Sequence, residues 1–190
     1  MPTSTRDRLL DSALSRFADE GVLGTTLDQV REGAGASVGA IYHHFPDKEA
    51  LYDAVRARAL ADFQEAFATE LDRHDEAEAG IRAVVELQIA WCAANRDAAK
   101  LLLEGRPSSA PELNRDFFPR ILAWWRPHAH YGAVRDLDFL LIYALWLGPA
   151  MEVTRHWLQG AGKKPGRAQI ETLADAAWAA LKSPEAEETR

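Results

Sequence analysis

Apolar side chains recur every three or four residues along nearly the whole chain, which is the spacing of one face of a helix. The first such face comprises Leu9, Leu10, Ala13, Leu14, Phe17 and Ala18. Ser4 with Asp7 is suited to cap the start of this helix, and Gly21 is suited to end it. No segment alternates apolar and polar residues as a strand would. The pattern therefore predicts an all-α protein.

Two short helices are expected to follow the first. Thr26 with Gln29 forms a capping-box pattern, and Gly33-Ala34-Gly35 breaks the helix that it opens. Ser37 is suited to cap a third helix that runs to Phe45. Pro46-Asp47 stops that helix and starts the next one. The first part of the chain is thus expected to be a compact three-helix unit.

The remaining chain predicts longer helices. An i+4 ladder of Val55, Ala59, Phe63 and Phe67 indicates a fourth helix from Asp47 to about Leu71. Further helices are expected at 77–95, 98–104, 110–126, 134–160 and 167–182, and Pro149 is expected to bend the helix at 134–160. The predicted organisation is a helix-turn-helix domain at 1–46, a connecting helix at 47–74, a second helical domain at 75–182 and a flexible polar tail at 183–190.

Charge and cysteine content narrow the classes of function. The formal net charge is -7, so we expect only weak non-specific attraction to nucleic acid. Cys92 is the only cysteine, which fits the reducing cytoplasm. The apolar run from Phe139 to Met151 is too short to span a bilayer and is typical of a buried helix. We expect a cytoplasmic protein without a membrane segment.

The segment from Thr26 to Phe45 has the parts of a helix-turn-helix that reads DNA: a support helix, a glycine turn and a short second helix. Small residues near Ser37 let the second helix approach the major groove, where Val38 and Ala40 can touch thymine methyl groups. Tyr42, His43 and Lys48 are suited to hold phosphates. The predicted DNA-binding residues are Thr26, Ser37, Val38, Gly39, Ala40, Tyr42, His43 and Lys48.

The stretch TTLDQVREGAGASVGAIYHHFPDKEALY, residues 25–52, closely resembles the DNA-binding signature of the TetR family. The resemblance implies nine or ten helices, a homodimer and a ligand cavity in the C-terminal domain. It predicts a repressor that a small apolar or aromatic effector releases from a palindromic operator on double-stranded DNA. Arg31 and Gly33 depart from the family pattern. Arg31 replaces a small apolar residue, and Gly33 replaces a good helix former.

The second domain holds all six tryptophans, which lie either in a core or around a ligand. The adjacent pairs Phe117-Phe118 and Trp124-Trp125 favour a helix that is covered on a wide arc. The predicted ligand-binding residues are Gln88, Trp91, Asn95, Phe117, Ile121, Trp124, His128 and Tyr143. A plain core is the alternative interpretation of the same aromatic residues.

The helix through 139–151 and the stripes at 170–181 predict a four-helix dimer interface, and closure of the monomer core is the alternative. His128-Ala-His130 lacks further ligands at metal-like spacing, so neither a metal nor another cofactor is expected. We find no signature of a nucleophile or of a phosphate loop, so we expect no enzyme. A helical enzyme or small-molecule carrier with an accessory helix-turn-helix remains the alternative from another class.

Overall fold

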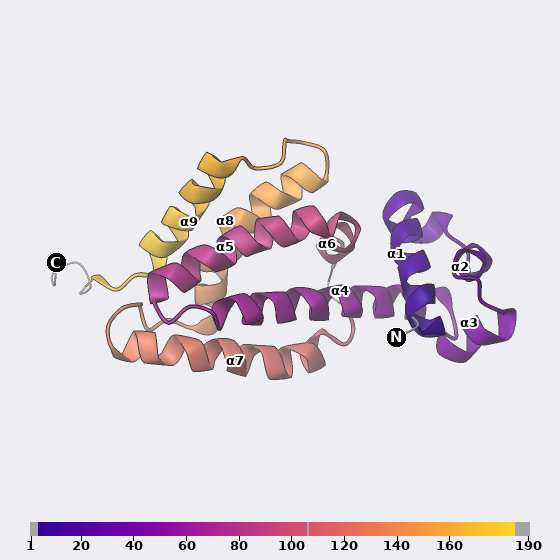
Figure 1. Cartoon of the computed structure of the whole chain (residues 1–190), viewed down its shortest axis with the longest axis horizontal. Coiled ribbons are helices and arrows are strands. Elements are labelled where there is room, and N and C mark those ends of the chain that lie inside the picture. Colours follow the sequence, from indigo (N-terminus) through magenta and orange to yellow (C-terminus); the bar gives the residue numbers. More distant parts are fainter. Residues whose placement is uncertain (1–3, 106, 185–190) are drawn as a thin grey trace. The chain divides into compact units, whose positions relative to one another are not determined.

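The computed structural model describes residues 4–105 and 107–184 of the chain, and it confirms the all-α prediction (Figure 1). Its helices are α1 (Thr5–Gly24), α2 (Leu27–Gly33), α3 (Val38–His44), α4 (Lys48–Leu71), α5 (Ala77–Ala94), α6 (Arg96–Leu103), α7 (Ala110–His130), α8 (Phe139–Leu158) and α9 (Arg167–Leu181). The chain divides into two compact units: unit 1 comprises residues 1–61 and 95–113, and unit 2 comprises 62–94 and 114–190. Residues 185–190 of the predicted tail lie outside the described residues.

Unit 1 encloses a small, mainly aliphatic core between α1, α2, α3 and the start of α4, and the core also includes Phe17 and Phe45. Leu9, Val30, Ile41 and Leu51 are almost completely buried there. The predicted start signals are confirmed. The Ser4 side chain accepts a hydrogen bond from the Asp7 backbone at the start of α1, Thr26 and Gln29 form the capping box of α2, and the Ser37 side chain accepts from the Ala40 backbone in α3.

Helix α6 belongs to unit 1, although the sequence boundaries placed it in the second domain. It packs against α1, and its Leu101 is fully buried in the core of unit 1. The segment that follows α6 is also held within this unit, because the Tyr52 hydroxyl donates to Glu104 and the Ser108 backbone donates to Asp53 at 2.7 Å. Helix α6 therefore belongs to the unit in which Leu101 is buried, although α5, which precedes it in the chain, belongs to unit 2.

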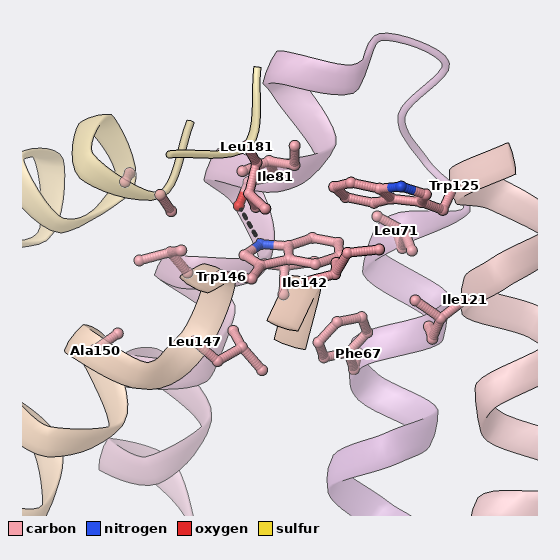
Figure 2. Close-up of a cluster of buried hydrophobic side chains, with 14 of the residues drawn as sticks. Phe67, Leu71, Ile81, Ile121, Trp125, Ile142, Trp146, Leu147, Ala150 and Leu181 are labelled. Carbon is pink, nitrogen blue, oxygen red and sulfur yellow. Dashed lines mark hydrogen bonds between the residues drawn. The ribbon is translucent and has the colours of Figure 1, made fainter. Parts of the chain in front are cut away.

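The core of unit 2 is aromatic (Figure 2). Helices α5, α8 and α9 pack against one another, and Trp146 of α8 lies at the centre of the cluster. The ring of Trp146 lies 5.4 Å from that of Phe67 and 5.7 Å from that of Trp125, and its Nε1 donates to the Ile81 carbonyl at 2.9 Å. These contacts join α8 to α4, α7 and α5.

Three helix boundaries differ from the sequence expectation for local reasons. Helix α8 starts at Phe139 rather than at 134, because the Asp138 side chain caps it and Val134 pairs with Lys182 in an isolated bridge. Helix α7 continues through Pro127 to His130. Gly21 takes the expected positive φ of 72°, but it kinks α1 and the helix continues to Gly24.

The two departures from the family pattern have structural reasons in unit 1. Arg31 pairs with Asp28 and Glu32 and also donates to the Ala36 carbonyl at 3.3 Å. Gly33 leaves room for Ser12, because a Cβ at residue 33 would lie 2.5 Å from the Ser12 Oγ. These contacts stabilise the end of α2 without a side chain at residue 33.

Candidate functional site

The outer surface of α3 carries most of the predicted DNA-binding residues. Val38 and Tyr42 are 55% and 56% exposed, although both are large and partly apolar. Ser37, Gly39 and His43 are exposed as well, while Ala40 is half-buried. The opposite face of the helix is anchored by Ile41, which is buried in the core of unit 1. The fold therefore brings these six predicted residues together on one exposed surface.

Thr26 and Lys48 already have roles within unit 1. The Thr26 Oγ1 accepts from the Gln29 backbone at 3.2 Å as part of the capping box. The Lys48 Nζ donates to the Thr25 carbonyl at 2.9 Å, which ties the start of α4 to the α1–α2 linker. An ammonium group has three donors, so this bond leaves Lys48 able to contact a phosphate.

Arg6 is a candidate that the sequence analysis missed. Its guanidinium lies over the ring of Phe45, 5.7 Å from the ring centre, directly after the end of α3. The side chain is exposed, and an arginine held on an aromatic ring is a common contact for phosphate. The sequence shows only that Arg6 is a basic residue in the first turn of α1. It does not indicate that the side chain lies beside Phe45.

Most predicted ligand-binding residues lie together in unit 2. Phe117 and Ile121 of α7 are buried in its core, and Gln88 of α5 is only 3% exposed. Trp124 is half-buried and its ring lies 4.2 Å from that of His128. Tyr143 packs against the same core, and Trp91 contacts Phe63 at 5.2 Å.

Asn95 stands apart from the other seven predicted ligand-binding residues. It is exposed, it precedes α6, and it belongs to unit 1. The helical periodicity of residues 77–95 placed it on α5, but α5 ends at Ala94. The structure therefore does not group Asn95 with the aromatic cluster.

Unit 2 buries polar atoms that lack hydrogen-bond partners among the described residues. These atoms are the Gln88 Oε1, the Thr154 Oγ1 and the Trp125 Nε1. Thr154 is 2% exposed and continues the buried stripe of Trp146 and Ala150 on α8. Buried polar groups are normally paired, so these three atoms are exceptions in a mainly apolar interior. Sequence analysis missed Thr154 because a threonine on an apolar stripe is common.

Other chemistry is limited in the part of the chain that the structure describes. It holds no group of three His, Cys, Asp or Glu side chains placed to bind a metal ion. Burial raises the pKa of the Cys92 thiol to about 12, which keeps it protonated and a poor nucleophile at neutral pH. Within residues 4–105 and 107–184, no helix is both long and apolar enough to cross a membrane.

Comparison with known proteins identifies the class of this fold. The model of the bacterial regulatory proteins of the tetR family matches residues 9–55. The transcriptional repressor AcnR of Corynebacterium glutamicum is 41% identical over 64 residues, which are 34% of each chain. The repressor KstR2 of Rhodococcus jostii is 27% identical over 178 residues, 89% of this chain and 85% of that one.

Solved structures share the fold over nearly the whole chain. A TetR-family regulator from Marinobacter aquaeolei aligns with a TM-score of 0.75 and 19% identity, covering 94% of this chain and 96% of that one. A TetR-family regulator from Haemophilus influenzae aligns with a TM-score of 0.78 and 15% identity, covering 94% and 97%.

The fold and the α3 surface together define a helix-turn-helix protein of the regulatory class. Residues 9–55 match the model of the tetR-family regulatory proteins, and the chain shares its fold with TetR-family regulators over nearly its whole length. The match to AcnR and the match to KstR2 of Mycolicibacterium smegmatis span about a third of each relative's length.

Proposed function

We propose that the protein is a ligand-responsive, DNA-binding transcriptional repressor. The observation that carries this proposal is the exposed face of α3, on which Val38, Gly39 and Tyr42 face solvent while Ile41 holds the helix in the core. A short helix anchored in this way and presenting small side chains fits the major groove. Arg6, Thr26, His43 and Lys48 supply further polar groups within the same unit.

Operator binding tests the proposal directly. Ala40→Glu is expected to nearly abolish binding, because it places bulk and negative charge against the groove. Tyr42→Phe and Lys48→Ala are expected to weaken binding to all sequences, since phosphate contacts carry no sequence information. The matched control is Ala176→Glu on the exposed side of α9. Binding of Ala40→Glu at the level of the control would show that α3 is not the reading helix.

We also propose a two-fold homodimer that reads a palindrome-like site, with half-sites about one helical turn or ~34–36 Å apart. The apolar stripe of α9, which includes Ala174, Ala177 and Leu181, is buried against the chain's own core. What supports the dimer is instead the outer side of α8, where Leu140 is 73% exposed and Leu141 and Ala144 also face solvent.

Light scattering at micromolar concentration is expected to report a mass near twice the 21.1 kDa of one chain. Leu141→Arg and Ala144→Arg are expected to shift the protein toward the monomer, because a buried unpaired charge opposes association. Leu23→Arg is the matched control, since Leu23 is 96% exposed in unit 1. A wild-type monomer across this range would contradict the dimer and weaken the palindrome prediction.

The effector is proposed to be a neutral, mainly apolar molecule that binds in unit 2. None of the fully buried side chains in the described residues carries a charge, so an anionic ligand would lose its hydration without gaining a buried cation. Of the predicted ligand-binding residues, Gln88, Trp91, Phe117, Ile121, Trp124, His128 and Tyr143 belong to this unit.

The polar contacts of this ligand are proposed to come from Gln88 and Thr154. Trp146 donates to the Ile81 carbonyl, which fixes the level at which α8 crosses α5. Figure 1 shows α5 and α8 running in the same general direction. Gln88 and Thr154 each lie about two turns beyond that contact on buried faces. They are therefore suited to hydrogen-bond one ligand between the two helices.

A thermal-shift screen of neutral and anionic compounds, paired with operator binding, tests the sensor. A true effector is expected to quench tryptophan fluorescence and weaken operator binding over one concentration range, since coupling of ~1–3 kcal/mol is typical. Trp124→Ala is expected to shift both curves together. If Trp124 is only core, the variant instead loses ~3–5 kcal/mol of stability and binds DNA poorly with or without ligand.

Thr154→Val tests whether the unpaired Thr154 hydroxyl binds the effector or stabilises the fold. It is expected to weaken the effector response while leaving the ligand-free protein as stable as before, because it replaces an unpaired buried polar atom with a methyl group. Thr172→Val is the matched control, since the exposed Thr172 hydroxyl donates to the Ala168 carbonyl at 2.9 Å. An unchanged effector response in Thr154→Val would exclude Thr154 from the ligand site.

A further inference from the structure

Gly39 is a glycine that the fold of the chain does not require. It lies in α3, and it is absent from the glycines of the described residues that take a positive φ. A Cβ placed on it would meet no heavy atom within 4 Å, so an alanine fits. Glycine is a much poorer helix former than alanine. Stability alone would therefore favour alanine at residue 39.

Two other helical glycines show the contrast. A Cβ on Gly33 would lie 2.5 Å from the Ser12 Oγ, and a Cβ on Gly80 would lie 2.5 Å from the Trp124 ring. Each of these glycines makes room for a neighbour inside its own unit. The open space over Gly39 is on the exposed side of α3, so no described residue of its own unit needs this room.

The chemistry of α3 narrows what fits this space. Residues 37–45 contain no Arg, Lys, Asn, Gln, Asp or Glu. Bidentate contacts to guanine or adenine need arginine, lysine, asparagine or glutamine, and acceptance from cytosine needs a carboxylate. The first turn of α3 instead presents the exposed aliphatic side chain of Val38 beside the open space over Gly39. The apolar group that DNA offers in the major groove is the C5 methyl of thymine.

We propose that Val38 and Gly39 form a specificity site for thymine: the thymine methyl occupies the space over Gly39 and packs against Val38. This inference rests on the proposed function, because it takes α3 to be the helix in the major groove. It goes further by assigning the base and the atom that the helix reads. The half-site is accordingly expected to contain a thymine whose methyl group contributes to affinity.

Removal of the methyl from the DNA is the first test. An operator is selected with the wild-type protein from random duplexes, and each half-site thymine is then replaced by deoxyuridine. At one position the affinity of the wild type is expected to fall about fourfold, the fold-change that corresponds to ~0.8 kcal/mol for one buried methyl-sized group. Val38→Ala is expected to bind more weakly and to lose most of this discrimination at the same position.

Addition of a methyl to the protein is the second test. Gly39→Ala is expected to melt at or above the wild-type temperature, yet to bind the thymine operator about tenfold more weakly because the contact is overpacked. On the deoxyuridine operator it is expected to regain most of that loss, since one methyl then replaces the other. Gly24→Ala is the control in the same unit, where a Cβ makes only an ordinary 3.5 Å contact.

The outcomes separate this inference from the proposed function. A wild-type protein that selects no DNA overturns both. Selective binding that is indifferent to every thymine methyl overturns the inference and leaves the proposed function standing. Equal weakening of Gly39→Ala on the thymine and deoxyuridine operators would mean that Gly39 lies against the DNA backbone, which also overturns it.

Discussion

In unit 1 a glycine at the end of α2 makes room for a hydroxyl group, whereas in unit 2 a glycine in α5 makes room for an indole ring. The Ser12 hydroxyl beside Gly33 donates to the Val30 carbonyl at 2.9 Å. The half-buried Trp124 ring beside Gly80 packs against the aromatic core, and its Nε1 donates to the His74 carbonyl at 2.8 Å. Similar close approaches thus serve a local polar contact in one unit and a bulky aromatic contact in the other.

This difference extends to what stabilises each unit. Unit 1 is fixed by side-chain caps at Ser4, Thr26 and Ser37 around a small, mainly aliphatic core. Unit 2 is fixed by rings that meet across α4, α7 and α8. Caps are worth about 1 kcal/mol each, while truncation of a buried aromatic ring costs several times more. The two units are therefore expected to respond differently to comparable substitutions.

Trp146→Ala is expected to have the largest effect, a loss of ~3–5 kcal/mol in the free energy of unfolding. The variant removes the ring at the centre of the aromatic core and leaves a cavity (Figure 2). Urea unfolding followed by tryptophan fluorescence measures the change, because every tryptophan lies in unit 2. Leu23→Ala, at a residue 96% exposed in unit 1, is the control. A loss as small as that of one cap would contradict an aromatic core.

Gly80→Ala is expected to destabilise unit 2 by ~1–3 kcal/mol, even though alanine is the better helix former. The reason is the 2.5 Å distance between the added Cβ and the Trp124 ring. Fluorescence-detected urea unfolding measures this loss. In a Trp124→Leu background the same substitution is expected to cost little. An equal cost in both backgrounds would show that the indole is not what Gly80 accommodates.

The sequence predicts the two units to different extents, because unit 1 depends on local caps and unit 2 on contacts between rings of different helices. The caps of unit 1 pair residues three positions apart, so Thr26 with Gln29 and Ser37 before α3 were readable from local spacing. The exposed face of α3 followed from the same periodicity. What spacing could not predict in unit 1 was non-local: Leu101 of α6 in its core, Arg6 over Phe45, and the Lys48 bond to Thr25.

In unit 2 the sequence predicted the helices but not their partners. Periodicity identifies apolar faces, yet it does not tell whether the 170–181 stripe meets a second subunit or the chain's own α5 and α8, which is where it packs. Gln88 was included among the predicted ligand-binding residues. Thr154 was missed, since its significance depends on burial without a partner, a property of the packed structure.

Gly33→Ala is expected to cost ~0.5–1.5 kcal/mol, the usual range for one hydrogen bond. The added Cβ displaces the Ser12 hydroxyl from its bond to the Val30 carbonyl. Thermal melting followed by circular dichroism detects the change in unit 1, where fluorescence has no tryptophan to report. Ser12→Ala is expected to remove most of the added cost of Gly33→Ala. A loss that persists in the double variant would assign the role of Gly33 to the backbone.

The smallest expected effect concerns His128 in unit 2. Its titration is expected to make the free energy of unfolding depend on pH. Burial against Trp124 lowers the pKa of this histidine below its usual 6.5, although Glu76 and Asp75 act in the opposite direction. The unfolded chain then takes up a proton at a higher pH than the folded one. The stability that neutral His128 contributes is full above pH 6.5 and is lost as the pH falls through the lower, folded-state pKa.

Fluorescence-detected melting of wild type and His128→Gln between pH 7.5 and 5 measures this slope, which the variant is expected to flatten. Parallel pH profiles for the two proteins would show that the imidazole takes up its proton at the same pH in the folded and unfolded chains. That result would contradict the burial of His128 in unit 2.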